Sequence, residues 1–124
     1  MEKLVEIRQM IQRSPSARAP DRDAQRLLLY VFTTTRGGFT RLQMILHLSR
    51  VPMNTNQLAH AMNLDYKAAQ HHLEVLEKNN LVTKMGDKYG ALFYLSNYLE
   101  ANILALDLVV SSLERQMSRK KVYL

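Results

Sequence analysis

The feature that most constrains the fold is a break between two apolar-periodic segments in the stretch NQLAHAMNLDYKAAQHHLEVLEKNN. The break falls at Asn63-Leu64-Asp65, where no proline forces it. Asn is the best substitute for glycine in the left-handed conformation that ends many helices, and Asp is a good N-cap for the next helix. The sequence therefore predicts a short helix, a tight turn and a longer helix over residues 66–79, which is a helix-turn-helix.

The two helices of this pair are expected to cross closely, with small or apolar residues between them. Asn54 or Thr55 can cap the short helix. The inward-facing positions are predicted to be Leu58, Ala59 and Met62 on the first helix and Ala69, Leu73 and Leu76 on the second.

Two β-rich runs, LVTKM and KYGALFYLS, follow the helix pair. They are joined by Gly86-Asp87, which predicts a β-hairpin. A helix-turn-helix followed at once by a hairpin is a winged helix. The predicted fold class is mainly α with a small β-hairpin (α+β), a winged helix-turn-helix with extra N- and C-terminal helices.

Residues 1–22 are predicted to form an N-terminal helical arm and a linker. Leu4, Ile7 and Ile11 lie on one helical stripe. The stretch RSPSARAPDRD that follows is rich in Ser, Pro and Arg, a composition typical of linkers. The first helix is therefore expected to be an arm rather than part of the core.

The run QRLLLYVFTTT, residues 25–35, is continuously apolar at its centre and fits either a buried strand or a helix. Asp23 is a plausible N-cap and favours a helix.

A further helix is predicted after Arg36-Gly37-Gly38, with Thr40 as its N-cap. Gln43 would complete a capping box, Phe39 and Met44 would form a hydrophobic staple, and Arg50-Val51-Pro52 would end the helix.

Residues 97–124 are predicted to form a C-terminal dimerisation helix, separate from a DNA-binding domain at 23–96. Asn97 and Glu100 would form its capping box. Its apolar residues step by four and three, a heptad seam that pairing with a second copy would cover. The alternative is packing of this seam against the chain's own helices, with Leu104 and Leu108 turned to solvent. The predicted seam residues are Leu99, Ile103, Leu106, Val110, Leu113 and Met117.

The run TRLQMILHL, then NQLAHAMNLDYKAAQHHLEVLEKNNLV, the hairpin and the terminal helix together resemble ArsR-like winged-helix transcription regulators. The archaeal branch is the most similar, through its Leu-Asp-Tyr-Lys opening of the second helix and a later His-His-Leu. The likeness covers residues 40–95 well and the flanking helices loosely. The family's metal sensors use Cys thiolates near this region, and the chain has no cysteine, so thiolate metal sensing is not expected.

Five polar residues of the second helix are expected to face away from the core, and the first four are the DNA-binding candidates: Tyr66, Lys67, Gln70, His71 and Glu74. Lys can bind phosphate or guanine, Gln can pair with adenine, and His and Tyr can donate to bases or phosphates. The alternative is an ordinary solvated face, but the wing and the net charge of +6 favour DNA readout. His72 is expected to point inward, as the structural His of the family does.

Basic residues outside this helix are further DNA-binding candidates. Lys84 and Lys88 flank the hairpin tip, where winged-helix proteins contact the DNA backbone or minor groove. Arg41 could reach a phosphate through the start of its helix. For Arg41, as for Arg36 and Arg50, a purely solvated role is equally open.

No catalytic residue, metal site or cofactor is predicted. The sequence holds no nucleophile elbow, phosphate loop or paired-carboxylate arrangement, and its four histidines have no HxxxH or HExxH spacing. The N-terminus MEKLVEIRQM lacks the apolar region of a signal peptide, and no apolar run reaches the roughly 20 residues that span a bilayer. A cytoplasmic protein without membrane contact is expected.

The sequence thus predicts a homodimeric, sequence-specific regulator of transcription that binds double-stranded DNA and is not an enzyme. Its helix 66–79 would read the major groove, and the 84–88 wing would contact the backbone or minor groove. Two alternatives remain: a winged-helix protein-interaction or RNA-binding adaptor, and a chromatin-type DNA binder without sequence preference.

Overall fold

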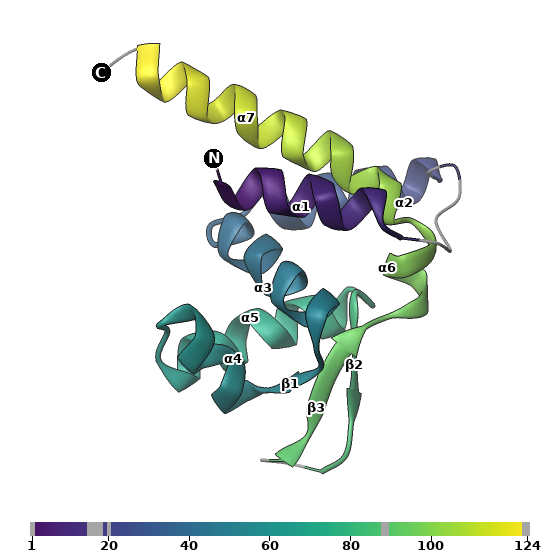
Figure 1. Cartoon of the computed structure of the whole chain (residues 1–124), viewed down its shortest axis with the longest axis vertical. Coiled ribbons are helices and arrows are strands. Elements are labelled where there is room, and N and C mark those ends of the chain that lie inside the picture. The colour runs from purple at the N-terminus through teal and green to yellow at the C-terminus, as the bar shows by residue number, and fades with distance from the viewer. Residues whose placement is uncertain (1, 15–18, 20, 88–89, 123–124) are drawn as a thin grey trace.

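The computed structural model describes residues 2–14, 19, 21–87 and 90–122 (Figure 1). Helices α1, α2 and α7 form one layer, α3 lies in the middle, and α4, α5 and a small sheet form the other end (Figure 1). The elements are α1 (Glu2–Gln12), α2 (Arg22–Leu29) with a π-helical turn (Tyr30–Thr34), α3 (Gly38–Arg50), β1 (Met53–Asn54), α4 (Thr55–Met62), α5 (Tyr66–Lys78), β2 (Val82–Met85), β3 (Leu92–Leu95), α6 (Asn97–Ala101), a 3₁₀ turn (Ile103–Ala105) and α7 (Leu106–Val122).

The sheet is antiparallel with strand order β1-β3-β2. The predicted hairpin is confirmed, but its two strands are not joined by a tight Gly-Asp turn. Met85 pairs with Leu92, so residues 86–91 form the connection and the second strand starts later than the run KYGALFYLS indicated. Gly86 has a φ of 99°, a conformation that favours glycine.

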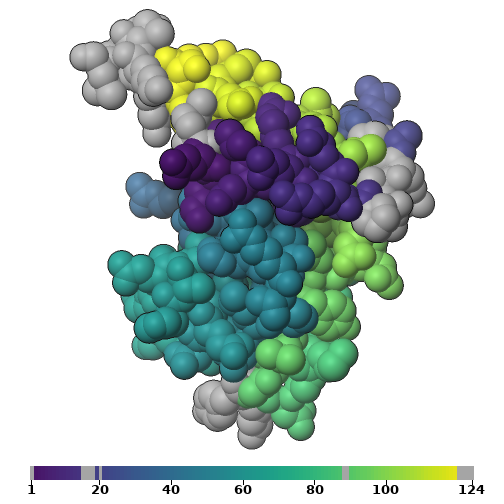
Figure 2. All heavy atoms as spheres, viewed as in Figure 1, coloured from purple at the N-terminus to yellow at the C-terminus, as the bar shows by residue number. Residues whose placement is uncertain are grey.

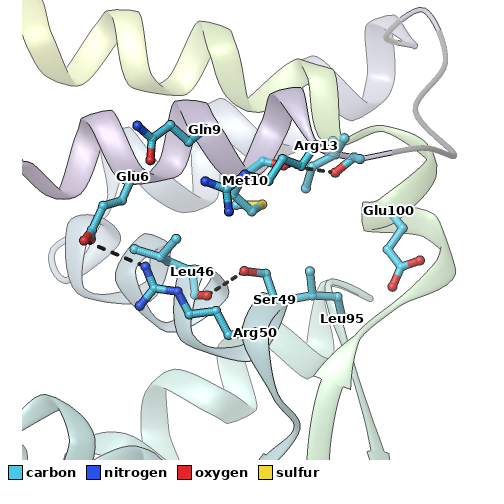
Figure 3. Close-up of a pocket in the computed structure, with 11 residues that line it drawn as sticks. Glu6, Gln9, Met10, Arg13, Leu46, Ser49, Arg50, Leu95 and Glu100 are labelled. Atoms are coloured by element: carbon cyan, nitrogen blue, oxygen red, sulfur yellow. Dashed lines mark hydrogen bonds and ion pairs between the residues drawn. The ribbon is translucent and has the colours of Figure 1, made fainter.

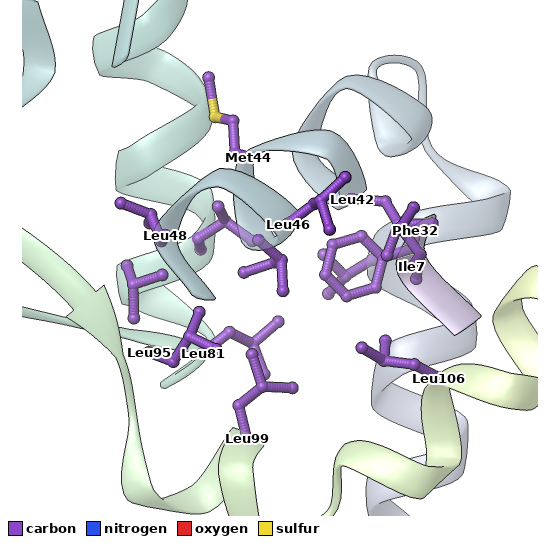
Figure 4. Close-up of a cluster of buried hydrophobic side chains, with 14 of the residues drawn as sticks. Ile7, Phe32, Leu42, Met44, Leu46, Leu48, Leu81, Leu95, Leu99 and Leu106 are labelled. Carbon is purple, nitrogen blue, oxygen red and sulfur yellow. The ribbon is translucent and has the colours of Figure 1, made fainter. Parts of the chain in front are cut away.

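One hydrophobic core connects the terminal helices with the helix-turn-helix and the sheet (Figure 4). Leu4, Ile7 and Ile11 of α1 are buried in it, and α1 packs against both α3 and α7. The expectation of an N-terminal arm outside the core is therefore wrong. The Ser- and Pro-rich stretch correctly marks the end of α1, but the apolar stripe decides where the helix packs. No helix among the described residues is long and apolar enough to cross a membrane.

Tertiary contacts, rather than local caps, determine where α2 and α3 begin. The run 25–35 is helical, as predicted, but Asp21 rather than Asp23 is the N-cap residue of α2. Helix α3 starts at Gly38, so Thr40 lies inside its first turn and the predicted capping box and staple are not formed. A Cβ on Gly38 would lie 2.3 Å from the Phe32 carbonyl oxygen, so only glycine permits this close approach.

The C-terminal segment is a broken helix, not the continuous one predicted. Ser96 replaces Asn97 as the cap of α6, with its Oγ accepting a hydrogen bond from the Leu99 N–H at 3.0 Å. The helix then breaks at Asn102, which is fully buried. The Asn102 amide donates to the Tyr98 carbonyl at 3.0 Å and its Oδ1 accepts from the Asp21 N–H at 3.4 Å. Asn side chains compete in this way with the regular helical hydrogen bonds.

The predicted heptad seam does not form an exposed stripe. Leu99, Ile103, Leu106, Val110 and Leu113 are all buried in the chain's own core, and Met117 packs against that core. Leu108 is 43% exposed and Leu104 is half-buried. The structure thus agrees with the alternative interpretation, in which the seam packs against the chain's own helices. Surfaces of α1, α2 and the π-helical turn cover the seam.

Candidate nucleic-acid interface

The turn between α4 and α5 has the geometry that its sequence predicted. Asn54 and Gln57 form a capping box at the start of α4. Asn63 is left-handed, with φ 55° and ψ 45°, and ends the helix. Asp65 then caps α5, its Oδ1 accepting a hydrogen bond from the Ala68 N–H at 2.7 Å. Short-range hydrogen bonds thus define the conformation of the turn, and the packing of α4 on α5 completes the motif.

Helix α5 has one buried face and one polar face. Ala69, Leu73 and Leu76 are buried, as predicted. The four candidate DNA-binding residues of α5 are all exposed on the rest of its surface: Tyr66, Lys67, Gln70 and His71. No large apolar side chain other than Tyr66 is exposed on this helix.

A groove of about 310 Å³ separates α5 from the wing. Tyr66 and Gln70 line it from the helix, and Lys84 lines it from β2. Lys88 lies outside the described residues, so only one of the two wing lysines is placed. Glu74 and Glu77 also line this groove. Their carboxylates would repel phosphate, so the end of the groove near Tyr66 and Lys84 is the more favourable one for DNA.

A second groove, of about 360 Å³, runs along the opposite flank of α5. It brings His71 and Lys78 from α5 together with Arg36 from the loop before α3. Lys78 is a site residue that the sequence predictions missed, although it lies two turns after His71 and one turn after Glu74 on the same helix. The sequence leaves Arg36 open between a solvated role and a phosphate contact, and the proximity of Arg36 to His71 is a tertiary feature.

Arg41 cannot contact DNA as expected, because its side chain is only 3% exposed and is used inside the protein. Its guanidinium donates to the Thr35 hydroxyl and to the carbonyl of Arg36 at 3.2 Å. The same nitrogen, Nη2, also lies 3.4 Å from the Val31 carbonyl oxygen. Burial lowers the Arg41 pKa from its ordinary value, with the neighbouring Tyr30 opposing this shift. Arg41 is a structural residue that holds the turn before α3.

His72 points inward, as predicted, and joins α5 to α3. The Arg41 Nη1 lies 3.0 Å from the His72 Nδ1, and the Arg donor requires Nδ1 to accept. The His72 pKa is lowered by burial first, and then by the positive charges of Arg41 and His71. Neutral His72 is therefore the form that fits this contact. Gly37 packs on the same ring, since a Cβ there would lie 2.6 Å from the His72 Cε1.

The histidines do not converge on one site. His71 and His72 have ring centroids 5.7 Å apart and point to different sides of α5. Among the described residues, no group of three or more His, Asp and Glu side chains could hold a metal ion.

Comparison with known proteins identifies the region that holds these features. Residues 39–84 match the family described as bacterial regulatory protein, arsR family. No curated protein matches the chain. A similar solved structure is the homodimeric winged helix-turn-helix DNA-binding domain of a possible ArsR-family transcriptional regulator from Mycobacterium bovis. The identity is 20%, the TM-score is 0.55, and the match covers 76% of this chain and 88% of that one.

The structural likeness establishes the fold, and the family match covers α3, the helix-turn-helix and the first wing strand. The chain therefore has a winged helix-turn-helix fold, and within it residues 39–84 are similar to the arsR family of bacterial regulatory proteins.

Proposed function

We propose that this protein is a homodimeric transcriptional regulator that recognises specific sequences in double-stranded DNA. Helix α5 would enter the major groove through Tyr66, Lys67, Gln70 and His71. The wing would contact the adjacent backbone through Lys84. The observation that carries this proposal is the exposed polar face of α5, which lies next to the wing. The opposite face of the helix is buried in the core.

The two grooves beside α5 support assigning different tasks to its residues. Gln70 lies toward the wing, whereas His71 lies toward Arg36 and Lys78. Gln70 is the better candidate for reading a base, since its amide can pair with an adenine edge. Lys78 and Arg36 are candidates for phosphate contacts, which fix the register of the helix on the duplex.

Selection of bound duplexes from a random pool tests sequence specificity. A palindromic consensus with half-sites about 10 bp apart, or a multiple of that, is expected for a two-fold dimer. Gln70→Ala should relax preference at one or two positions and weaken binding by about 1–3 kcal/mol. Lys78→Ala should weaken binding to all sequences and lower the slope of affinity against salt concentration by about one. An unchanged consensus and affinity in Gln70→Ala would disprove the assignment of α5 to the groove.

The adaptor and chromatin-type alternatives predict other results. An interaction module would more often present an apolar patch where α5 has its polar face. Equal affinity for selected and random duplexes across a salt titration would favour a binder without sequence preference.

The homodimer is proposed because the similar domain from Mycobacterium bovis is described as homodimeric. Since the heptad seam is buried in cis, we assign pairing to the outer face of α7 instead. That face starts with Leu104 and Leu108 and continues through Ser112 and Arg115. The C-terminal part of α7 extends beyond α1 (Figure 1 and Figure 2), so it is a candidate surface for contact with a second copy.

Leu108→Asp tests this face, with Val51→Asp as control because Val51 is also exposed but lies at the end of α3. Sedimentation should give dimers for the wild type and for Val51→Asp, and folded monomers for Leu108→Asp. The monomeric variant should bind the operator more weakly, because it can no longer contact both half-sites at once. A wild type that sediments as a monomer at tens of micromolar would disprove the homodimer.

A further inference from the structure

An open cavity of about 520 Å³ lies between α1, the end of α3, the end of β3, α6 and the 3₁₀ turn that follows it (Figure 3). No residue of α4 or α5 lines it. The cavity is therefore separate from the proposed DNA-binding surface. Its volume falls in the range of about 300–1,000 Å³ that is usual for small-molecule sites.

The inner wall of this cavity is apolar. Leu46 of α3, Leu95 of β3 and Ile103 are core residues, and Met10 of α1 covers them as a half-buried side chain. Met adapts its shape to a neighbouring group more easily than other apolar residues. An apolar group of a ligand would replace water on this wall.

Positive charge at the cavity comes from two arginines on different elements, Arg13 at the end of α1 and Arg50 at the end of α3. The Arg50 Nη2 is 3.8 Å from the Glu6 Oε1, longer than the 2.7–2.9 Å of a charge-assisted hydrogen bond. No side-chain hydrogen bond or ion pair joins Arg13 to another residue in the described ranges. Both guanidinium groups therefore keep donors for a carboxylate.

Negative charge at the cavity comes from Glu6 of α1 and, on the opposite side, from Glu100 of α6; Glu6 is the one that faces Arg50. Its Oε2 is buried and has no hydrogen-bond partner among the described residues. The Lys3 Nζ is 3.6 Å away, which attracts the carboxylate but is too long for a hydrogen bond. Buried polar atoms are almost always hydrogen-bonded, so this oxygen can accept a hydrogen bond from a ligand. Figure 3 shows Glu6 and Arg50 facing each other at one end of the cavity.

We propose that the cavity binds a small zwitterion with an apolar body, of the class of the apolar α-amino acids. Arg13 binds its carboxylate, the Glu6 Oε2 accepts from its ammonium group, and its side chain covers Met10, Leu46 and Leu95. The cavity provides both charges and an apolar wall, whereas a purely anionic ligand would leave the Glu6 oxygen unpartnered and in repulsion. This ligand site goes beyond the proposed DNA-binding function and does not depend on it.

The test is thermal unfolding of the full chain without DNA, in the presence of L-leucine, L-isoleucine, L-methionine or L-phenylalanine at 10 mM. At least one of them should raise the unfolding midpoint by several degrees in a concentration-dependent way, because a ligand of the native state stabilises it. For the best of the four, the amide, which lacks the carboxylate, and the N-acetyl derivative, which lacks the ammonium group, should each give a much smaller rise.

Calorimetric titration of variants locates the site. Arg13→Gln and Glu6→Gln should each weaken binding about tenfold or more, since each removes a charge-assisted hydrogen bond. Glu2→Gln is the matched control, because Glu2 is exposed on the same helix and does not line the cavity, and it should bind as the wild type does. The proposal fails if none of the four amino acids changes the midpoint. It also fails if the amide and N-acetyl derivatives act equally well, or if Arg13→Gln binds normally.

Discussion

Helices α5 and α7 meet the rest of the molecule in opposite ways. Helix α5 rests on one stripe, Ala69, Leu73 and Leu76, and leaves a polar face exposed. Helix α7 is buried from several sides, since α1, α2 and the π-helical turn all pack against it. The first arrangement lets surface residues change without affecting the fold, and the second makes apolar residues of the helix part of the core. The same apolar periodicity therefore has different consequences in the two helices.

The largest expected effect is on α7. Leu106 is fully buried, so Leu106→Asp places an unpaired carboxylate in the core and should destabilise the protein by about 4 kcal/mol or more. Because small domains are stable by only about 5–15 kcal/mol, this loss removes a large part of the free energy of unfolding. Urea unfolding followed by circular dichroism measures this change.

Leu108→Asp is the matched control for Leu106→Asp, because Leu108 is 43% exposed only two residues away. Its free energy of unfolding should change by about 0.5 kcal/mol or less once the oligomeric state is taken into account. Equal loss of stability in both variants would show that Leu106 and Leu108 do not differ in burial as described.

These two leucines also show what periodicity can and cannot predict. The steps of four and three correctly identified an apolar face on residues 97–124. They could not identify its partner, because α1 and α2 are brought to it only by the tertiary fold. The break at Asn102 depends likewise on a contact with Asp21, far away in the sequence.

The helix-turn-helix was predictable because its determinants are local. The caps Asn54 and Asp65 and the left-handed Asn63 each act within four residues along the chain. The start of α3 was not predictable in this way. Gly37 and Gly38 are needed for contacts with His72 and Phe32, and these outweigh the capping box that Thr40 could have formed.

The next largest effect concerns the polar contact between α3 and α5. Arg41→Ala removes the guanidinium that Thr35, the Arg36 carbonyl and His72 share, and leaves these partly buried acceptors without their donor. A loss of about 2–4 kcal/mol in the free energy of unfolding is expected. Arg41→Lys keeps the positive charge but lacks the planar guanidinium that donates to several partners at once. The stability of this variant should therefore lie between those of the wild type and Arg41→Ala. A lysine variant as stable as the wild type would contradict the role of the fork.

Stability should also fall as the pH decreases below neutrality. Burial lowers the pKa of His72 and also that of His47, whose neighbours Lys3 and Arg50 lower it further while Glu6 opposes them. The folded protein thus binds fewer protons than the unfolded chain, whose His pKa is about 6.5, so acidification through that value favours unfolding. Urea midpoints between pH 8 and pH 5 measure this dependence.

His72→Gln separates the two histidines, because a Gln oxygen can still accept from Arg41 but does not titrate in this range. The midpoint of this variant should depend less on pH than that of the wild type, and adding His47→Gln should flatten the curve further. A steeper pH dependence in His72→Gln would mean that the His72 pKa is raised in the folded protein, contrary to the contact with Arg41.

The smallest effect is expected at the surface contact between α1 and α7. The Arg8 guanidinium lies 2.7 Å from the Glu114 Oε1 and 3.3 Å from the Asp107 Oδ1, and it donates to the Ser111 hydroxyl at 3.3 Å. These side chains are partly exposed, so water and salt weaken the attraction and Arg8→Ala should cost only about 0.5–1 kcal/mol. Lys3→Ala, which breaks a pair with Glu6 inside α1 alone, is the control and should change the stability less.

Repeating both measurements in 1 M NaCl should remove most of the difference between Arg8→Ala and the wild type, because ion pairs at the surface are screened there while the apolar contacts of α1 are not. If the difference persists in high salt, the Arg8 side chain stabilises α7 mainly by packing over it, and the burial of α7 extends further to the surface than its apolar residues alone imply.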